Sequence, residues 1–522
     1  MSLGMSLKAH EAAIRFPLRC LVSPGPAPLT EDHPYRPDPG GTMTMQASRS
    51  RPRGHPQFSV TGRAVRPVVT IWRRAWRPIA GAALNRVTER AKIRISRRIA
   101  IIAAAAAAAV PLAAAVPATA AAAGSATAPA DTVTQWNLTM IAGLEAAGVP
   151  PPPSARIGAI VQASVFDAVN GITRRYASYH VAPAAPPGAS RAAAAASAAY
   201  TALVALIPAQ KPLFDAQLAA TLAQISDDPS DPGQSVERGL GWGQTVAGAI
   251  LAWRAADGFD AVLPPYVAGS APGDWQPTPP LFGPPLFRQF ATMTPFALTS
   301  PSQFLPPGPP RLASARYTGD LAEVQALGSA ASSVRTPEQT QTAIFWQADT
   351  AAAMWNRVAD QLAQAHHATL THNARQLALM NIALADATIG IWNAKNTYNF
   401  WRPVTAIRVG ADPAWTPLLP TPAFQEYPSG HSGISSAAAA VLAAFYGNNT
   451  SFSVTSAGLE GTERDFTSFS SAVQQVEDAR IYAGFHFRFS CIDGATLGAQ
   501  VASYVTHTLM QPVHNEVRHL NN

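Results

Sequence analysis

Three short segments near the C-terminus carry the side chains best able to do chemistry. Residues 395–403 read KNTYNFWRP, residues 428–433 read PSGHSG, and residues 479–488 read ARIYAGFHFR. Together they supply three cations, a hydroxyl group, a helix-end amide and two histidines. Each close cation stabilises an anion by about 4 kcal/mol at about 4 Å when the effective dielectric constant is near 20. The segments therefore predict a receptor for a tetrahedral oxyanion that carries two or three negative charges.

The first segment is expected at the end of a helix. Lys395 and Arg402 are seven residues apart in the sequence, and because this is about two helical turns, both cations would lie on one face. Pro403 disfavours helical backbone at Arg402, which places the arginine at or just beyond the helix end. The apolar neighbours Trp392 and Trp401 argue against a solvated basic face.

The second segment is expected at a helix N-terminus. A Pro-Ser-Gly turn precedes the strongly helical run 434–446. The Ser429 hydroxyl and the Gly430 N–H would therefore lie where a helix attracts anions, and His431 follows them directly.

The third segment adds Arg480 and His486, six residues apart. Six is not a face-sharing interval on a straight helix, so either Gly484 interrupts the helix or the two side chains approach from different turns. Arg488 competes with Arg480 for the inward position.

The order Lys-x6-Arg-Pro, Pro-Ser-Gly-His and Arg-x5-His resembles the signature of the type 2 phosphatidic acid phosphatase and vanadium-dependent haloperoxidase superfamily. These motifs cover residues 395–493. A wider resemblance to secreted bacterial vanadium haloperoxidases begins near Trp136 and includes Asp167-Ala-Val-Asn170.

The resemblance implies a role for each matching residue. His486 would be the axial histidine, which bonds vanadium in haloperoxidases and attacks phosphorus in phosphatases. His431 would be the acid–base histidine, and Lys395 would also polarise bound peroxide. The residues that would hold the oxygens of vanadate, or of phosphate in the same site, are Lys395, Arg402, Ser429, Gly430 and Arg480.

Further residues are implied around this site. Trp392 and Phe424 match apolar residues on the halide side of fungal chloroperoxidases, where an apolar wall leaves a small anion poorly hydrated and more nucleophilic. Asp349 resembles the carboxylate that pairs with the second arginine, here Arg480.

The chain departs from the family pattern at two positions. Ala479 stands where the family usually has Ser, and Ser490 stands where it usually has the Asp four residues after the axial histidine. Asp493 is the candidate replacement for that carboxylate as the partner of the axial histidine.

The implied activity is that of an exported haloperoxidase that uses hydrogen peroxide to oxidise halide to hypohalous acid, with vanadium acting as a Lewis acid. One alternative is a secreted acid phosphatase that acts on phosphomonoesters through a phosphohistidine at His486. Another is an oxyanion-binding protein without turnover, which the missing carboxylate at position 490 leaves open.

An all-α fold must position these residues. Ala-rich stretches recur and aromatic residues make up only 8% of the chain, so helices packed through small side chains are expected rather than a sheet. The expected helical bundles, which could form two four-helix-bundle-like halves sharing one core, comprise residues 134–147, 155–171, 189–206, 210–225, 233–256, 315–330, 337–366, 371–394, 431–446, 470–485 and 493–509.

Composition divides the chain into regions. Residues 264–310 hold 14 of the 47 prolines, which excludes helix and predicts a long ordered loop. We expect a disordered region at 1–86, outside the working protein if translation begins near Val87. An export signal would follow at 87–121, then an N-terminal helical region at 122–310 and a C-terminal catalytic region at 311–522.

The export signal has the basic, apolar and small-residue parts that secretion requires: 90–98, 99–111 and a site near Ala118-Thr119-Ala120. The protein is therefore expected to be secreted or extracytoplasmic, by a general or a twin-arginine route. Beyond residue 123 the longest apolar runs are short and interrupted, so no membrane-spanning body is expected.

Charge and cysteine content exclude other classes. Residues 1–98 hold 18 Lys+Arg and 5 Asp+Glu, a net charge of +13, which leaves 20 − 26 = −6 for residues 99–522. An acidic body repels a polyphosphate backbone, so no nucleic-acid partner is expected. Two cysteines at opposite ends of the chain cannot form a disulfide framework. His366, His367 and His372 could suggest a second metal site, but they are interpreted as solvated residues of a loop between helices.

Overall fold

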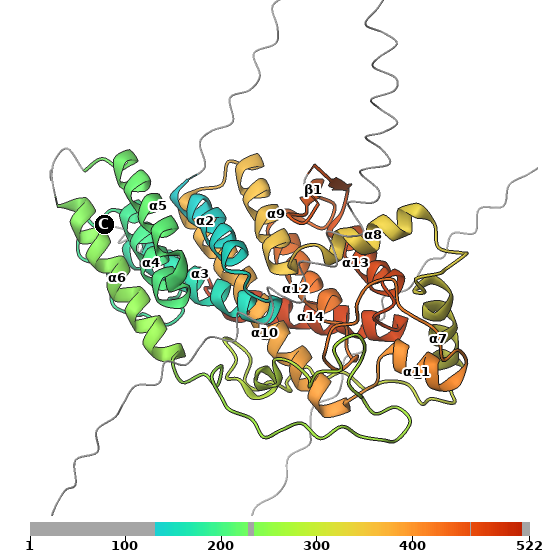
Figure 1. Ribbon diagram of the computed structural model, residues 1–522. Helices are drawn as coiled ribbons and strands as arrows, with labels where there is room; N and C mark the ends of the chain where they lie inside the picture. The colour runs from blue at the N-terminus through green and yellow to red at the C-terminus, as the bar shows by residue number, and fades with distance from the viewer. Residues whose placement is uncertain (1–130, 228–233, 460, 514–522) are drawn as a thin grey trace, which may run out of the picture. The chain divides into compact units, whose positions relative to one another are not determined.

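A long helix, α10 (Leu370–Tyr398), lies between two groups of helices (Figure 1). The computed structural model describes residues 131–227, 234–459 and 461–513, all of which belong to one unit. The regions expected at 1–86 and 87–121 lie outside the described residues.

The helices before the proline-rich stretch form the first group. They are α2 (Thr132–Ala147), α3 (Pro151–Thr173), α4 (Arg191–Leu206), the 3-10 turn η1 (Pro208–Gln210), α5 (Lys211–Gln224) and α6 (Ser235–Arg254).

The remaining elements follow the proline-rich stretch and its 3-10 turn η2 (Arg288–Thr292). They are α7 (Ala315–Leu327), α8 (Pro337–Gln347), α9 (Ala351–Ala365), α10, α11 (Pro403–Gly410), α12 (Gly430–Tyr446), β1 (Phe452–Thr455), β2 (Glu463–Phe466), α13 (Phe469–Tyr482) and α14 (Arg488–Thr508). In the described part of the chain, the only sheet is the antiparallel hairpin β1–β2, in which Phe452 pairs with Phe466.

Helix α10 joins the two groups into one core. It packs against α3 of the first group and against α12 and α14 of the second. One hydrophobic cluster of buried residues extends from Val133 in α2 to Met510 beyond α14. The all-α fold class is confirmed.

Several element boundaries differ from the expected ones. The helix expected at 337–366 is two helices, because Thr350 leaves the helix and its hydroxyl accepts the N–H of Ala353 as the cap of α9. Helix α3 begins at Pro151, since proline is tolerated in the first turn. Helix α10 continues to Tyr398, so Lys395 is helical. Helix α11 and the β1–β2 hairpin were not expected.

The proline-rich stretch is a loop, as expected, and it is anchored to α10. The buried carboxylate of Asp386 accepts three backbone N–H groups, from Phe296 at 2.6 Å, Ala297 at 2.7 Å and Leu298 at 2.9 Å. A second anchor lies just beyond α10, where the Trp401 N–H donates to the Gly273 carbonyl at 2.8 Å. The loop therefore lies against the C-terminal half of α10.

Glycines let α12 and α14 approach each other closely. A Cβ atom on Gly498 would lie 2.0 Å from the carbonyl oxygen of Gly433, and one on Gly494 would lie 2.5 Å from that of Ser429. The Ser429 N–H also donates to the Ser490 carbonyl at 3.0 Å. This contact fixes the start of α12 against the start of α14.

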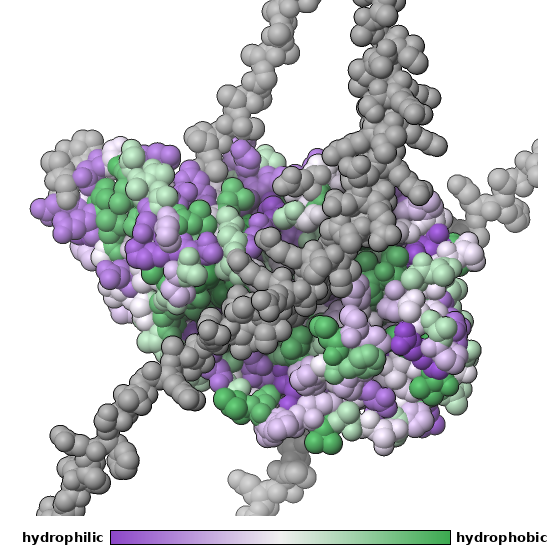
Figure 2. Space-filling model, viewed as in Figure 1, coloured by the Kyte–Doolittle hydropathy of each residue, from purple (hydrophilic) through white to green (hydrophobic). Residues whose placement is uncertain are grey.

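Among the described helices, α10 alone is long and apolar enough to cross a membrane, and the bent pair Arg191–Leu206 with Pro208–Gln224 passes the same test if taken as one span. The apolar window of α10 is 94% buried inside the bundle, which is the environment of a core helix. The face seen in Figure 2 mixes hydrophilic and hydrophobic residues.

Candidate oxyanion site

The structure brings the three sequence segments together at the ends of four helices. Lys395 lies in the last turn of α10, Arg402 is the N-cap of α11, Ser429 is the N-cap of α12, and Arg480 lies in the last turn of α13. His486 lies in the turn between α13 and α14. All five side chains are buried, with at most 2% of each residue exposed.

Gly484 makes this convergence possible. Helix α13 ends at Tyr482, and Gly484 adopts a left-handed φ of 80°, a conformation that favours glycine. Of the two arrangements left open by the sequence, the structure has the one in which this glycine interrupts the helix. Arg488 instead points away and pairs with Glu323 and Asp478.

Lys395 binds the backbone that leads into α12. Its Nζ donates to the carbonyl oxygens of Gln425 at 2.8 Å, Glu426 at 2.9 Å and Pro428 at 2.6 Å. Burial, and then the charge of Arg402, lower the pKa of Lys395 well below its usual value. Because an ammonium has three N–H groups, contact with an oxyanion would require one of these bonds to exchange.

Arg402 faces His486. Its Nε donates to the Phe424 carbonyl at 2.8 Å, its Nη1 donates to the Phe485 carbonyl at 3.0 Å, and Nη1 lies 3.2 Å from Nε2 of His486. The remaining nitrogen, Nη2, is buried with no hydrogen-bond partner in the described structure. Burial lowers the pKa of Arg402 to about 10, so the group stays cationic at neutral pH.

Arg480 has even fewer partners. Its Nη2 donates to the side-chain oxygen of Gln347 at 2.9 Å, whereas Nε and Nη1 are buried without a partner among the described residues. Burial lowers the pKa of Arg480 to about 9. Unpaired buried donors are costly, and here three guanidinium nitrogens of two cations remain unpaired. This donor set fits an oxyanion such as vanadate or phosphate.

The start of α12 borders the same site. The Ser429 hydroxyl accepts the hydroxyl of Ser432 at 2.9 Å and the N–H of Ser432 at 3.5 Å. His431, in the first turn, is half-buried and makes no hydrogen bond to the described residues. Burial, followed by the charges of Arg480, Lys395 and Arg402, lowers its pKa well below the usual value. His431 is therefore neutral at neutral pH and free to accept a proton.

Aromatic rings line one side of the cations. The rings of Trp392 and Phe424 lie 5.3 Å apart, and the Phe424 ring lies 5.3 Å from Nζ of Lys395 and 4.9 Å from the guanidinium of Arg402. The indole N–H of Trp392 donates to the Leu286 carbonyl at 3.2 Å. The proline-rich loop thus completes this apolar wall.

Comparisons with known proteins agree with this arrangement. Residues 375–515 match the family described as the VCPO second helical-bundle domain. A solved structure described as the first bacterial vanadium-dependent iodoperoxidase is 26% identical, with a TM-score of 0.65, and the match covers 74% of this chain and 97% of that chain. Residues 375–515 therefore match this helical-bundle domain family, and the described chain has the fold of a bacterial vanadium haloperoxidase.

Two further proteins match at lower identity or over shorter segments. The vanadium chloroperoxidase of Curvularia inaequalis is 27% identical over 166 residues, which are 26% of this chain and 27% of that protein. A crystal structure of a holo-type bacterial vanadium-dependent chloroperoxidase shares the fold, with 17% identity, a TM-score of 0.56 and coverage of 69% of this chain and 93% of that chain.

Two residues expected in the oxyanion site lie elsewhere. Asp349 forms an ion pair with Arg357 and accepts the N–H of Ala457 at 3.1 Å, so it does not pair with Arg480. Asp349 lies at the break between α8 and α9. Gln347, the last residue of α8, contacts Arg480 in its place. Asp493 accepts the Tyr427 hydroxyl at 2.7 Å and does not contact His486.

The carboxylate that contacts His486 is Glu426, which sequence reasoning missed. Its Oε1 lies 2.8 Å from Nδ1 of His486 and accepts the N–H of Phe487 at 3.0 Å. One signal was present in the sequence: Glu426 is an acidic residue two positions before the Pro-Ser-Gly-His motif, in a chain with only 13% charged residues. Such a residue in an apolar setting is more often paired than solvated.

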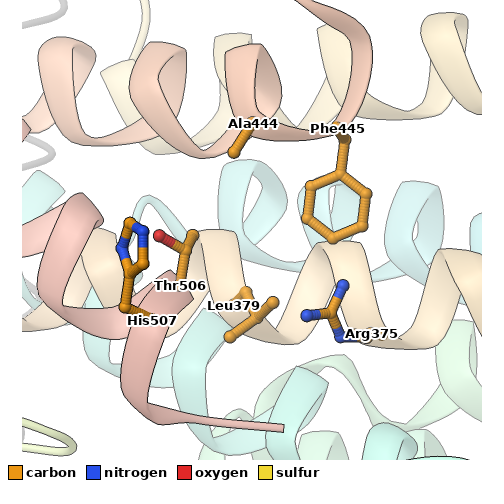
Figure 3. A pocket seen from close by; sticks show the side chains of 6 residues that line it. All are labelled: Arg375, Leu379, Ala444, Phe445, Thr506 and His507. Carbon is orange, nitrogen blue, oxygen red and sulfur yellow. The ribbon is translucent and has the colours of Figure 1, made fainter. Parts of the chain in front are cut away.

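A cavity of about 200 Å³ is separate from this site (Figure 3). It lies near the N-terminal end of α10 and is lined by Arg375, Leu379, Ala444, Phe445, Thr506 and His507.

Two histidine rings near this cavity pack against aromatic rings. The His366 ring lies 4.7 Å from the Tyr446 ring, and the His372 ring lies 5.1 Å from the Phe445 ring. Among the described residues, no group of three His, Cys, Asp or Glu side chains could hold a metal ion.

Proposed function

We propose that this chain is a vanadate-dependent haloperoxidase, which oxidises halide with hydrogen peroxide to hypohalous acid or its equivalent. The observation that carries the proposal is the set of unpaired guanidinium nitrogens of Arg402 and Arg480 beside His486. The likeness to a bacterial iodoperoxidase over 97% of its length supports it. When bound, vanadate would supply a Lewis-acid centre that activates peroxide without a change of oxidation state.

The residues of the chain divide the remaining work. His486 would hold the oxyanion through Nε2, while Arg402, Arg480 and the N-terminus of α12 balance its negative charge. Neutral His431 would accept a proton from peroxide and return it. Lys395 would keep the loop before α12 in place and add positive charge.

The aromatic side of the site suits the halide. Trp392 is only 4% exposed. The faces of the Trp392 and Phe424 rings carry no hydrogen-bond donor for a small anion. A halide at this wall would lose part of its hydration shell and attack peroxide more readily.

A paired assay on purified protein, stripped of metal and phosphate, tests the proposal. Halogenation of a phenol dye is followed with peroxide and iodide, bromide or chloride, with and without orthovanadate, beside hydrolysis of a nitrophenyl phosphate ester. We expect halogenation that requires vanadate and that phosphate inhibits by competition. Ester hydrolysis inhibited by vanadate, without halogenation, would assign the site to a phosphatase, and vanadate binding with neither activity would leave a binding protein.

The substitution His431→Ala tests the acid–base role separately. General acid–base catalysis typically contributes 10²–10⁴-fold, so we expect halogenation to fall by about that factor while vanadate affinity changes little. Unchanged halogenation would remove His431 from the mechanism.

We further propose that the enzyme acts outside the cytoplasm, because residues 90–120 have the composition of a secretion signal. N-terminal sequencing of protein recovered from outside the cell should find a start close to residue 121. A start upstream of Val87 would overturn both the proposed signal and the proposed translation start.

A further inference from the structure

Glu426 is a buried carboxylate whose position is fixed from several sides. The residue is 0% exposed. Its N–H donates to the Phe400 carbonyl at 3.0 Å, and its own carbonyl accepts Nζ of Lys395 at 2.9 Å. Oε1 accepts the N–H of Phe487 at 3.0 Å. Backbone and side chain are thus both held where Oε1 meets His486.

The two contacts of the His486 ring define its tautomer. Nε2 lies 3.2 Å from Nη1 of Arg402, and because a guanidinium has only donors, Nε2 must accept. Nδ1 lies 2.8 Å from Oε1 of Glu426, so Nδ1 carries the proton. Burial and the neighbouring positive charges lower the pKa of His486 well below its usual value, which agrees with a neutral ring.

A neutral ring with its lone pair on Nε2 is the form that can bond an oxyanion centre. A histidine that binds a metal typically donates its other N–H to a carboxylate, and this bond orients the ring and raises its basicity. Ser490 offers Nδ1 only a neutral hydroxyl at 3.5 Å, a longer contact than the 2.8 Å to the carboxylate of Glu426. Asp493 is engaged by Tyr427.

We propose that Glu426 is the positioning residue of His486: it holds the Nδ1–H tautomer and directs the Nε2 lone pair into the oxyanion site. The carboxylate missing at position 490 is thus supplied by the segment that precedes α12. The proposal rests on the proposed function for the identity of the bound oxyanion, but the orientation of His486 can be tested without it.

The test compares Glu426→Ala, Glu426→Gln and Asp493→Asn. Calorimetry measures the affinity for orthovanadate and for phosphate. Proton and nitrogen-15 NMR of protein labelled at histidine follows the hydrogen-bonded Nδ1–H of His486 without ligand, and His486→Asn assigns that signal. Glu477→Gln, at a buried carboxylate in α13, is the matched control for removing a buried acid.

We expect Glu426→Ala to lose the Nδ1–H signal and to bind vanadate about 10- to 100-fold more weakly. Glu426→Gln keeps an acceptor oxygen and should retain most of the affinity and the signal. Asp493→Asn and Glu477→Gln should match the unmodified protein. If Glu426→Ala does not fold, Glu426→Leu, which removes the acceptor but fills a similar volume, takes its place with the same two expected losses.

Two results would overturn the inference. One is an unchanged signal and an unchanged vanadate affinity in Glu426→Ala, and the other is the absence of a protected Nδ1–H in the unmodified protein. Neither depends on halogenation. A protein that binds vanadate through the Glu426–His486 pair but does not halogenate would contradict the proposed function alone.

Discussion

At the scale of single residues, the two arginines of the site differ in how they are oriented. Arg402 is held by two backbone carbonyls, whereas the only hydrogen-bond acceptor of Arg480 among the described residues is Oε1 of Gln347. The ring of Phe485 lies 4.8 Å from the Arg480 guanidinium and adds a cation–π contact. The direction of the Arg480 donors therefore depends on one neutral side chain.

This dependence predicts the effect of Gln347→Leu. The substitution removes the acceptor without adding charge, so Arg480 should lose its fixed direction and vanadate affinity should fall about tenfold. Calorimetry measures the change. An affinity within twofold of the unmodified value would show that packing against Phe485 suffices to orient the arginine.

Asp349→Asn is the matched control for that experiment. Asp349 pairs with Arg357 and accepts the N–H groups of Thr350 and Ala457, so its loss should cost about 1–3 kcal/mol of stability. Vanadate affinity should not change. A large loss of vanadate affinity in Asp349→Asn would show that Asp349 contributes to oxyanion binding.

The residues of the three motifs could be identified from the sequence because their spacing carries the information. Glu426 and Gln347 could not, because their roles depend on how separate segments approach in space. Lys395 draws residues 425–428 toward α10 and so brings Glu426 to His486. The break between α8 and α9 leaves Gln347 as the last residue of α8, facing Arg480.

At the scale of elements, the turn between α13 and α14 controls where His486 lies. A Cβ atom on Gly484 would lie 2.7 Å from the carbonyl oxygen of Gly328 and 2.7 Å from Cβ of Pro417. Gly484→Ala therefore combines an unfavourable φ with a steric clash. We expect a loss of more than about 1 kcal/mol of stability and weaker vanadate binding, measured by thermal unfolding and calorimetry.

Gly447→Ala separates these two effects. Gly447 also has a positive φ, of 85°, but nothing lies within 4 Å of its would-be Cβ. This variant should show the cost of φ alone and bind vanadate normally. Equal losses of affinity in both variants would mean that general destabilisation, and not displacement of His486, weakens binding.

The anchor of the proline-rich loop predicts a pH dependence of stability. Burial raises the pKa of Asp386 from 3.8 to about 6, although three backbone N–H groups oppose the shift. The folded protein thus retains a proton that the unfolded chain releases. The stabilising contribution is complete below about pH 4 and is lost as the pH rises through 6.

Urea unfolding of the unmodified protein and of Asp386→Asn between pH 4 and 7 measures this contribution. The difference in the free energy of unfolding between the two should decrease by up to about 3 kcal/mol as the pH rises, since two pKa units correspond to about that energy. A pH-independent difference would show that Asp386 titrates as it does in the unfolded chain.

Element boundaries could be predicted where one local rule dominates. Pro403 disfavours helix at the preceding residue, and Arg402 is indeed the non-helical N-cap of α11. The apolar period over 337–366 continues through the break at Thr350, so the sequence pattern did not indicate that a cap divides α8 from α9. The β1–β2 hairpin depends on contacts with α9, which no local pattern reveals.

At the scale of the whole molecule, the largest hydrophobic cluster connects the helices before the proline-rich loop with α10, α12 and α14. The N-terminal group reaches α10 through α3, and α10 carries Trp392 and Lys395 into the site. A ligand that binds only the folded site should therefore stabilise the whole described unit against unfolding.

Thermal unfolding with orthovanadate or phosphate tests this linkage. At a ligand concentration 100 times the dissociation constant, the gain should be about 2.7 kcal/mol in a single cooperative transition. Arg480→Ala should abolish the gain. A transition that splits into two, with only one shifted by ligand, would show that the helices before the proline-rich loop unfold independently of the site.

The proline-rich loop supplies much of the aromatic side of the site. The oxyanion side is built from helix ends locked by buried charges and by the close α12–α14 contact. The aromatic side receives Leu286, Phe287 and Phe290 from the loop, which contact Trp392. Between its anchors at Gly273 and at 296–298, the loop is also bonded to its surroundings: the Leu286 N–H donates to the Ala423 carbonyl at 2.9 Å, and the Asn393 side chain donates to the Ala291 carbonyl at 3.0 Å. A loop grafted from another protein would therefore have to reproduce these contacts to keep the aromatic wall in place.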